Sequence, residues 1–562
     1  MKVNGKPTRQ RKIDPSLASA FTQQGIHPVL ARVYAGRGIQ PGVVAPDISM
    51  LPDKSSLQNC MEAGAMLAES ITSGQRIIIV GDYDADGATS TACMLRGIRG
   101  FGGDVDFVVP DRRKHGYGLG TEIARMAKEK GGELVCTVDN GVSAHAGVAE
   151  AKRLGMTVVL SDHHLQGDTL PKADCLVNPN LNDSTFASRA LAGVGVAFYV
   201  LGALREEMRK RNSQNDFALG SLLDLVAVGT VGDLVPMDTC NRALVRMGME
   251  RIRARRASTG IQALLSVAGK NPATANSETA GFALAPRINA AGRLETADIG
   301  IRMLATDNMG EALRLAHDLD MINRERKTLQ MDMTETALDI IDSMQTDGRN
   351  ALVVFDGSFH EGVVGLVASR LKERFHRPSA AFAKAEDGTL KGSFRSIPGV
   401  HVRDVLDLVS KRAPGLVLKM GGHAMAAGAS IDAGGFDKFS SLFDRAVCDL
   451  ASDDAFSPEL ETDGVLAPTE MTYELAEAIA RENWGQGFPA PLFEGRFRVL
   501  SQRPIGTGHL KLQLDVGAGK MDAVFFGREE PVGEVIEATY RLDLNEYNGE
   551  RRLQIMIDGV GE

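Results

Sequence analysis

Short apolar runs alternate with amphipathic segments over the first half of the chain. The runs typical of buried strands are residues 76–80, 104–109, 133–138 and 156–161. The segments with helical periodicity between them are residues 88–100, 121–130 and 144–154. Strands that alternate with helices at this spacing predict βαβ units, and therefore an α/β domain built on a parallel sheet.

The second half of the chain contains three further patterns. Residues 305–345 are amphipathic, with no Gly or Pro between Gly310 and Gly348, which predicts one long connecting helix. A second, smaller α/β unit begins with the apolar run 351–355. Residues 497–557 are rich in alternating, β-branched and turn residues, as in a small β-barrel of the OB type. The expected domain limits are 1–50 for a peripheral lead-in, 51–304 for the first α/β domain, 305–345 for the connecting helix, 346–452 for the second α/β domain and 453–562 for the barrel.

Composition places the chain among globular proteins and gives no global sign of a nucleic-acid partner. Its 562 residues are 43% hydrophobic and 24% charged, with a formal net charge of -9, so any nucleic-acid binding must depend on local patches. The amino terminus is polar and basic, and no run approaches the ~20 apolar residues of a membrane span. The six cysteines show no CxxC pair and no zinc spacing. We therefore expect a cytoplasmic protein with reduced, mostly buried thiols and no membrane contact.

A cluster of carboxylates follows the first predicted strand. Asp82, Asp84 and Asp86 fall within five residues, between Gly81 and Gly87. The carboxyl ends of parallel strands are where open α/β sheets place their ligands. Three like charges this close repel one another unless a cation lies among them, and hard divalent cations take oxygen ligands. Taken alone, the cluster fits an acidic surface turn equally well.

Three later elements also end in residues that ligate metals. Asp139 follows the strand 133–138, Asp162-His163-His164 follows the strand 156–161, and Asp233 follows a predicted helix over 217–228. Each has an ordinary explanation by itself, such as an Asn-Gly turn after Asp139 or one packed and one exposed histidine. The conjunction favours a metal site, because parallel strands end at one edge. Carboxylates with imidazoles suit manganese or a similar divalent ion.

Several segments resemble one family closely. Residues 81–87, 138–141, 161–164 and 231–236 are similar to the four motifs of the DHH phosphoesterase superfamily, and residues 421–428 to the glycine-rich histidine motif of its DHH-associated domain. The loop 115–119, the segment 286–293 and the carboxy-terminal barrel fit the RecJ branch, whose members are 5′-to-3′ exonucleases on single-stranded DNA. The resemblance covers nearly the whole chain from about residue 50. It implies a DHH catalytic domain, a DHH-associated domain and an OB domain.

The resemblance implies a site for two Mn2+ (or Mg2+) ions, which together hold the attacking and leaving oxygens of an in-line displacement. The implied direct ligands are Asp84, Asp86, Asp139, His163 and Asp233, with Asp139 between the two ions. Asp82 either ligates directly or orients its neighbours. Asp162 is expected to fix the tautomer of an imidazole, and His164 to face the scissile phosphate.

The second domain is expected to bind phosphate. Gly421 and Gly422 let the backbone approach a phosphate, and His423 can donate a hydrogen bond to it; a glycine-rich turn with an incidental histidine is the alternative. Arg370 and the segment Ser393–Arg395 are similar to family segments that cradle the 5′-terminal phosphate. Either arginine could equally belong to a surface ion pair.

Further contacts to DNA are expected near the active edge. Arg112, His115 and Tyr117 form a basic loop with an aromatic ring that can stack on a base. Arg287 and Asn289, from the segment 286–293, are expected to contact the substrate. The basic run 251–256 is more typical of a solvated helix face. Only Trp484 is present near the barrel, so a stacking surface there would need Tyr or Phe.

The sequence therefore predicts a single-stranded-DNA-specific 5′-to-3′ exonuclease of DNA repair and recombination. We expect a monomer that threads its substrate between two α/β domains, with a helicase and a single-strand-binding protein as possible partners. One alternative is a DHH phosphodiesterase acting on short oligonucleotides or cyclic dinucleotides, although such relatives typically lack the barrel. The other is a metal-free replication scaffold, against which the intact acidic set argues.

Overall fold

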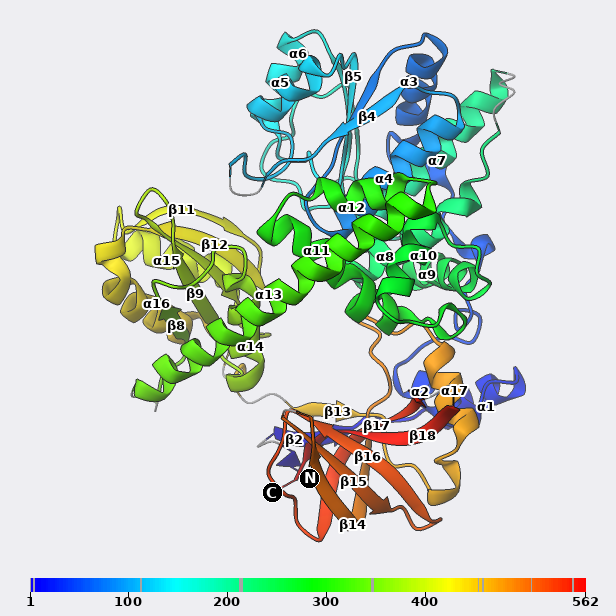
Figure 1. Cartoon of the computed structure of the whole chain (residues 1–562), viewed down its shortest axis with the longest axis vertical. Coiled ribbons are helices and arrows are strands. Elements are labelled where there is room, and N and C mark those ends of the chain that lie inside the picture. Colours follow the sequence, from blue (N-terminus) through cyan, green and yellow to red (C-terminus); the bar gives the residue numbers. More distant parts are fainter. Residues whose placement is uncertain are drawn as a thin grey trace. The chain divides into compact units, whose positions relative to one another are not determined.

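The computed structural model describes residues 2–3, 6–111, 114–211, 216–344, 348–452, 454–456, 459–506, 508–547 and 550–561. These residues belong to two compact units, Met1–Asp320 together with Leu460–Glu562, and Met321–Glu459. The chain thus leaves the first unit at residue 320 and returns to it at residue 460 (Figure 1).

A five-stranded parallel sheet forms the centre of the first unit. Its order is β4-β3-β5-β6-β7, and every neighbouring pair is parallel. The strands are β3 (Ile77–Val80), β4 (Val105–Val108), β5 (Leu134–Val138), β6 (Thr157–Ser161) and β7 (Cys175–Val177). β3 and β5 are buried at every position, which explains their continuous apolar sequences. The predicted parallel α/β sheet is confirmed.

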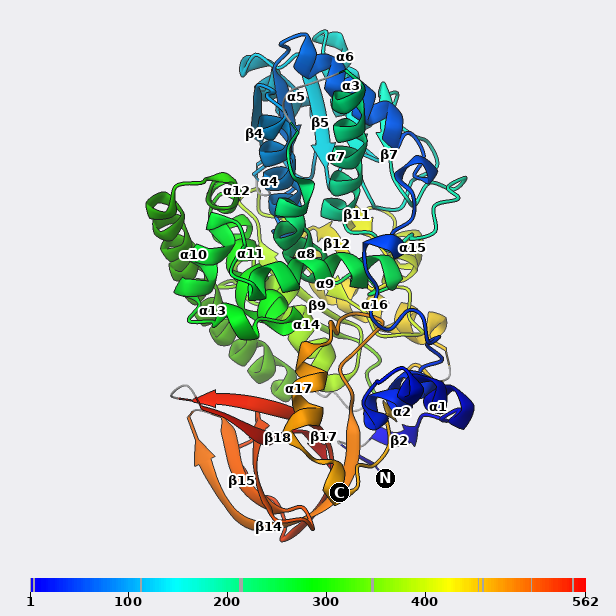
Figure 2. The ribbon, with the colours of Figure 1, turned by 90° about the vertical axis from the view of Figure 1, so that its right-hand side faces the viewer.

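Helices cover both faces of this sheet. One face packs against α3 (Cys60–Thr72), α4 (Ala85–Gly100) and α7 (Gly193–Lys210), and the other against α5 (Thr121–Glu129) and α6 (His145–Arg153). Strand residues alternate between the two cores: Ile77 and Ile79 join the first, and Ile78 and Val80 the second. Figures 1 and 2 show α4 and α7 side by side.

A helical region follows the sheet and packs against α4. Its members are α8 (Leu223–Gly232), α9 (Thr239–Arg253), α10 (Thr259–Val267), the π-helix η5 (Thr279–Leu284), α11 (Ala285–Leu294) and α12 (Asp298–Ala305). The long amphipathic pattern then forms a single helix, α13 (Met309–Ser343). None of the helices in the described part of the chain combines the length and apolar character that crossing a bilayer requires.

The second unit is a mixed five-stranded sheet of order β11-β12-β10-β9-β8. Only β8 and β9 are parallel, and the other pairs are antiparallel. Helices α15 and α16 share the hydrophobic core of the sheet, and α14 packs against β9 and β10. The elements are β8 (Leu352–Phe355), α14 (Val364–Phe375), β9 (Ser379–Lys384), β10 (Leu390–Arg395), α15 (Val402–Arg412), β11 (Val417–Gly422), β12 (Ala426–Ile431) and α16 (Phe436–Leu450).

A closed five-stranded barrel lies near the carboxy terminus, in the first unit. Its order is β14-β15-β16-β18-β17, with β16 and β18 parallel and the other neighbours antiparallel. Its strands are β14 (Phe493–Ile505), β15 (His509–Asp515), β16 (Lys520–Phe526), β17 (Val535–Tyr547) and β18 (Glu550–Val560). This connectivity is that of the OB fold predicted from the sequence.

The amino-terminal segment is not the peripheral lead-in that we expected. Strand β2 (Lys6–Gln10) pairs with β13 (Leu460–Thr462), and helices α1 (Pro15–Gln23) and α2 (Pro28–Gly36) follow it. Tyr34 of α2 is buried and stacks on Phe488, while Arg37 pairs with Asp463 at 2.8 Å. Local sequence patterns do not reveal partners so distant along the chain, so this packing escaped the prediction.

Candidate functional site

The first carboxylates lie in the turn between β3 and α4. Asp84 caps the helix, because its Oδ1 accepts the Gly87 N–H at 3.0 Å. Asp82 and Asp86 are buried on either side of it. Capping leaves the second oxygen of Asp84 available for another partner. The sequence pattern of a strand followed by Asp, small residues and a helix thus places three carboxylates at the carboxyl end of β3.

Asp139, at the end of β5, has a backbone that few residue types adopt. Its φ is 60°, in the left-handed region that Asp and Asn tolerate better than most side chains. The next residue, Asn140, is fully buried, and its Nδ2 donates to the carbonyls of Val80 (3.0 Å) and Val138 (2.8 Å). Its Oδ1 accepts the Leu119 N–H at 3.1 Å. The Asp-Asn-Gly segment is therefore more than a surface turn, because Asn140 ties together two strand ends and the loop before α5.

Asp162 orients the two histidines that follow β6. Its Oδ1 lies 2.8 Å from His164 Nδ1 and accepts the His163 N–H at 2.7 Å, while its Oδ2 accepts the Val142 N–H at 2.7 Å. These contacts occupy both oxygens of the carboxylate. Asp162 is thus placed where the sequence suggested, holding the Nδ1 side of an imidazole, and that imidazole belongs to His164.

The amino terminus of α7 holds Asp86. The Gly193 N–H donates to Asp86 Oδ2 at 2.6 Å and the Val194 N–H to Oδ1 at 2.9 Å, which places the carboxylate at the positive end of a helix. Gly193 also passes close to Asp139: a Cβ at this glycine would lie 2.6 Å from the Asp139 Cβ. Nothing in the sequence pattern pointed to this helix as part of the site.

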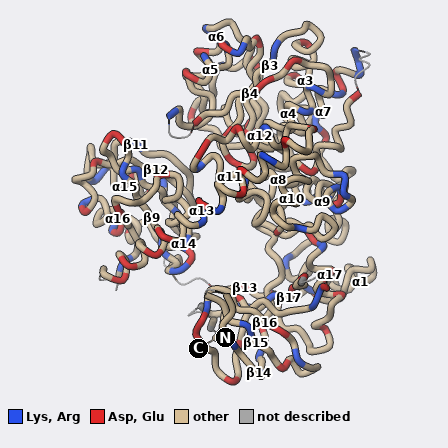
Figure 3. Tube along the Cα trace, in the orientation of Figure 1, with Lys and Arg blue, Asp and Glu red and all other residues tan. Residues whose placement is uncertain are grey.

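These ligand types converge into three overlapping groups of three, each with ligand atoms within 4.8 Å of one another. The groups are Asp82, Asp84 and Asp139; Asp86, His163 and Asp233; and Asp139, His163 and His164. The groups meet where Asp139 Oδ1 lies 3.0 Å from His163 Nε2. Asp233 Oδ2 lies 3.6 Å from the same nitrogen. In Figure 3 acidic positions gather between the labels β4 and α11.

The donor set fits divalent cations. Asp139 Oδ1, His163 Nε2 and Asp233 Oδ2 are buried and have no hydrogen-bond partner among the described residues. Buried polar atoms are nearly always paired, so three unpaired ligand atoms that point together indicate a cation between them. Carboxylate oxygens with a neutral imidazole suit Mn2+, or Mg2+ with fewer protein ligands, better than a thiolate metal.

Burial and mutual repulsion shift the protonation of this cluster when no metal is bound. Burial, then the neighbouring carboxylates, raises the pKa of Asp86 and of Asp139 well above the ordinary value. The same causes raise the pKa of Asp233 to about 7. Burial lowers the pKa of His163 to about 4, so its imidazole is neutral and able to ligate. Although burial opposes it, the hydrogen bond with Asp162 raises the pKa of His164 to about 9.

Besides Asn140, three further asparagines support the site, and sequence reasoning missed two of them. Asn180 Nδ2 donates to the His163 carbonyl at 2.6 Å and Asn178 Nδ2 to the His164 carbonyl at 2.8 Å. Both follow β7, so the available signal was a further polar pair after a strand. Asn289, predicted to contact substrate, accepts the Ala85 N–H at 2.7 Å with its Oδ1 and so holds the first turn of α4.

The basic loop after β4 is only partly as predicted. Arg112 lies outside the described residues. His115 turns back into its own loop, where its Nδ1 accepts the Asp111 N–H at 3.0 Å. Tyr117 reaches the metal-binding edge: its hydroxyl donates to the Asp139 carbonyl at 2.8 Å, and its ring packs against His164. Of the three, Tyr117 is the one the structure brings to the site.

The segment 286–293 forms α11 and packs on the carboxylate turn. A Cβ at Gly292 would lie 2.1 Å from the Tyr83 carbonyl oxygen, so only glycine permits this approach. Arg287 pairs with Asp320 at 2.8 Å and donates to the Ala283 carbonyl. These contacts give Arg287 a structural role, and its contact with substrate stays a prediction.

The second unit brings most of its predicted residues into one row. Ser393 and Gly421 pair with the same residue, Gly428, from opposite sides of β12. Arg395 Nη1 donates to the Ser393 hydroxyl at 3.1 Å, and both side chains lie against Gly365 at the start of α14. Gly422 and His423 follow on in β11 and its turn, with the His423 N–H donating to the Ala426 carbonyl. A guanidinium, a hydroxyl and a helix amino terminus together suit a phosphate.

Arg370 does not share these contacts. It lies on the exposed side of α14 and pairs with Glu373, 3.3 Å away, which matches the surface ion pair considered as its alternative. The basic run 251–256 is divided: Arg251 approaches the buried Asp224 at 3.7 Å, whereas Arg255 and Arg256 are exposed.

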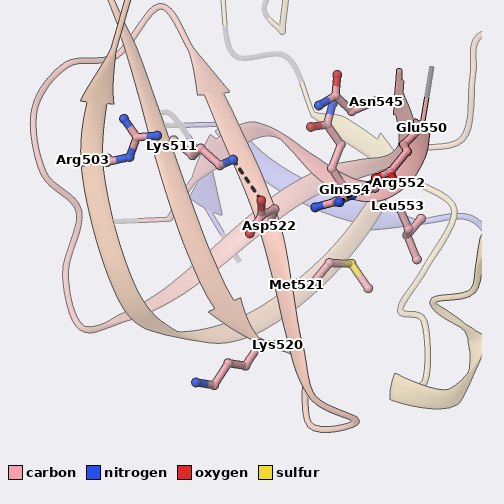
Figure 4. A pocket seen from close by; sticks show the side chains of 10 residues that line it. All are labelled: Arg503, Lys511, Lys520, Met521, Asp522, Asn545, Glu550, Arg552, Leu553 and Gln554. Atoms are coloured by element: carbon pink, nitrogen blue, oxygen red, sulfur yellow. Dashed lines mark hydrogen bonds and ion pairs between the residues drawn. The ribbon is translucent and has the colours of Figure 1, made fainter. Parts of the chain in front are cut away.

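The barrel carries a groove across strands β15, β16 and β18 (Figure 4). Its side chains are charged or polar apart from Met521 and Leu553, and no aromatic ring lines it. Trp484 is buried against Phe488, so it offers no stacking face. The lining residues are Arg503, Lys511, Lys520, Met521, Asp522, Asn545, Glu550, Arg552, Leu553 and Gln554.

Comparison with known proteins assigns the family. Three family models match: the DHH family amino-terminal domain at residues 76–230, the DHHA1 domain at 348–449 and the RecJ OB domain at 462–559. The protein named single-stranded-DNA-specific exonuclease RecJ from Salmonella typhimurium is 44% identical over 99% of both chains, and that of Escherichia coli is 43% identical over 98% of both.

Solved structures agree with these matches. The crystal structure of RecJ from Thermus thermophilus in complex with Mn2+ has a TM-score of 0.82 and 29% identity, covering 99% of this chain and 79% of that one. An exonuclease RecJ bound to manganese is 34% identical with a TM-score of 0.59, covering 70% of this chain and 95% of that one. With matches to the DHH, DHHA1 and RecJ OB domains and to curated RecJ proteins over nearly its full length, this chain belongs to the RecJ family of DHH proteins.

Proposed function

We propose that this chain is a single-stranded-DNA-specific exonuclease that hydrolyses phosphodiester bonds with two divalent cations, Mn2+ or Mg2+, and removes nucleotides from the 5′ end. It acts in DNA repair and recombination. One observation carries the proposal: unpartnered, buried ligand atoms of Asp139, His163 and Asp233 converge at one sheet edge, in a chain of the RecJ family.

We infer which residues would hold each cation from two of the three ligand groups. Asp82, Asp84 and Asp139 would hold one ion, and Asp86, His163 and Asp233 the other. The grouping of Asp82 with Asp84 and Asp139 supports a direct role for Asp82, rather than one in orienting its neighbours. When bound, such a pair of ions steadies the attacking and leaving oxygens of an in-line displacement and activates the attacking water.

The chain's own residues orient the substrate around this centre. Asp162 holds His164 by Nδ1, and the Nε2 of this imidazole, which lies 3.4 Å from the Tyr117 hydroxyl, would donate a hydrogen bond to an oxygen of the scissile phosphate. Against the effect of burial, the hydrogen bond with Asp162 raises the pKa of His164 and so favours the imidazolium, which donates a stronger hydrogen bond to a phosphate oxygen than a neutral imidazole does. In the second unit, Ser393, Arg395 and the glycine-rich turn at Gly421–His423 would bind the 5′-terminal phosphate.

End-labelled strands test the polarity. A single strand labelled at its 5′ end and the same strand labelled at its 3′ end are digested side by side with Mn2+ or Mg2+. We expect mononucleotide from the 5′-labelled strand first, and no loss of label from a blunt duplex over the same time. Earlier release of the 3′ label would contradict the polarity, and full activity after chelation would contradict the metal requirement.

A second comparison distinguishes the long-strand enzyme from a dinucleotide phosphodiesterase. We expect kcat/KM for a 20-nucleotide strand to exceed that for a 5′-phosphorylated dinucleotide, because the barrel groove contacts only the longer substrate. Equal values, or faster turnover of a cyclic dinucleotide, would favour the alternative. Point variants in the groove serve better here than deletion of the barrel, because Tyr34 and Arg37 pack on residues of the carboxy-terminal segment.

The oligomeric state, the domain limits and the protein partners are also proposed. We infer a cytoplasmic monomer with domains 51–304, 346–452 and 453–562, whose connecting segment 305–345 contains the helix α13, and which works with a helicase and a single-strand-binding protein. Light scattering on the purified protein tests the monomer, and pull-down by a single-strand-binding protein with DNA removed by nuclease tests that contact.

A further inference from the structure

Exposed apolar side chains directly follow residues of the metal site. Leu234 comes immediately after Asp233 and is 70% exposed, and Leu165 comes immediately after His164 and is 63% exposed. Single exposed leucines are common on protein surfaces and need no explanation. Two of them, each next to a residue of the same catalytic cluster, do.

The backbone at Leu234 makes the case stronger. Its φ is 61°, in the left-handed region, where Gly or Asn would be accommodated with less strain than Leu. This conformation ends helix α8, because Leu234 directly follows the C-cap Asp233, at a position that glycine usually occupies. The side chain is exposed, so packing does not explain why a leucine stands there in place of glycine, whereas contact with a ligand would.

The two leucines lie on neighbouring loops. Asp233 Oδ2 is 3.6 Å from His163 Nε2, so the loop of Leu234 and the loop of Leu165 meet at the metal-binding groups. A nucleotide whose phosphate reaches these groups therefore carries its base past both loops. An aliphatic side chain makes few favourable contacts with phosphate or sugar. It packs well against the face of a base.

We propose that Leu234 and Leu165 contact the nucleobases that flank the scissile phosphodiester, and so help to set the position of the strand in the site. This inference rests on the proposed function. It names two substrate-contacting residues that act in a way independent of base identity, because every base presents an apolar face.

Abasic substrates test the contact directly. Two single strands are compared, one normal and one with tetrahydrofuran abasic residues at its first two 5′ positions, with wild type, Leu234→Gly and Leu165→Ala. We expect wild type to prefer the normal strand by roughly tenfold in kcat/KM, mostly through KM, as one base contact of ordinary strength would give. In Leu234→Gly this preference should fall to about twofold or threefold. The variant has already lost its side of the contact, so removing the base costs it less than it costs wild type.

Two controls separate substrate contact from a structural role. Leu234→Gly relieves the left-handed backbone, so its melting temperature should equal or exceed that of wild type. Ile48→Ala removes an equally exposed aliphatic side chain that lies on none of the metal-site loops, and it should keep the full base preference.

The outcomes are distinct. An unchanged tenfold preference in both leucine variants would overturn the inference, and so would a wild type that degrades both strands equally. A wild type that degrades neither strand in the presence of Mn2+ would instead refute the proposed function itself.

Discussion

The metal-binding edge and the barrel groove lie in the same unit and are both rich in charge, but they hold it differently. At the metal-binding edge the carboxylates are largely buried; the Gly87 N–H holds Asp84, and the amino terminus of α7 holds Asp86. In the groove the charges are mainly on the surface, and Lys511 with Asp522, 2.9 Å apart, is a solvent-accessible ion pair.

The difference suggests that the metal-binding edge serves the chemical step and that the barrel groove serves substrate binding. Fixed, buried ligands can stabilise a transition state because they need no reorganisation when charge develops. Exposed cations can attract a polyanion, but salt screens them and their side chains move. We therefore expect changes at the sheet edge to act on kcat, and changes in the groove to act on KM and its salt dependence.

The largest effect is expected from Asp139→Asn. Asparagine tolerates the left-handed backbone at this position, so the fold should persist, while one metal-ligating carboxylate is lost. The activity with Mn2+ should fall on the order of a thousandfold, since metal ligation contributes several kcal/mol. The melting temperature in chelator should equal or exceed that of wild type, because one repelling charge is removed. Activity within tenfold of wild type would show that Asp139 is not a ligand.

Asp162→Asn should have a smaller effect on the same site. The variant places an amide where a carboxylate accepts main-chain N–H groups, and it weakens the hold on His164. Because loss of such a supporting residue typically lowers metal affinity or activity ten- to a hundredfold, we expect a decrease in activity of that size. Steady-state kinetics with a titration of Mn2+ measures the loss. Asp174→Asn is the matched control: Asp174 accepts the Val158 N–H at 2.8 Å in the same sheet but lies outside the metal cluster. Equal losses of activity in both variants would indicate a general effect on stability.

Removing two groove cations should change binding alone. For Arg503→Ala with Lys520→Ala we expect a KM a few times higher near physiological salt, with kcat unchanged. The slope of log affinity against log salt should become shallower by about 1.4, at ~0.7 per phosphate contact on a single strand. Fluorescence anisotropy over a salt series measures the slope. A changed kcat with an unchanged slope would remove the distinction between the two regions.

The smallest expected effect is thermal. Mn2+ at a hundred times its Kd adds about 2.7 kcal/mol to stability, which raises the melting temperature of a chain of this length by only about 2 °C. Because the pKa of Asp233 is raised from 3.8 to about 7, the metal-free folded form keeps a proton there that the unfolded chain has lost, and the stability linked to this proton declines as pH rises from 3.8 to about 7. Protons also compete with Mn2+ at this carboxylate. The increase should therefore be larger at pH 8 than at pH 6, as differential scanning fluorimetry can show; equal increases would argue against Asp233 as a ligand.

Sequence reasoning reached the sheet and the carboxylates because both are local signals. Buried strands read as apolar runs, and ligands such as Asp82 and Asp139 follow them directly. It did not reach Asn178, Asn180 or the amino terminus of α7, because their roles depend on main-chain atoms brought close by tertiary packing. Asn289 was predicted to contact the substrate. Its actual partner, the Ala85 N–H, could not be predicted because the two residues are far apart in the sequence. The groove without aromatic rings was likewise invisible, because register decides which residues face it.

The packing of the amino-terminal segment also has a consequence for biosynthesis. Arg37 and Asp463 are separated by 426 residues along the chain, yet they form a buried pair. At roughly 5–20 residues per second, a ribosome needs on the order of 20 to 90 s to add that length. Throughout this interval Tyr34 and the guanidinium of Arg37 wait without their partners. The first helices of the nascent chain therefore keep these side chains exposed until Asp463 and Phe488 have been synthesised.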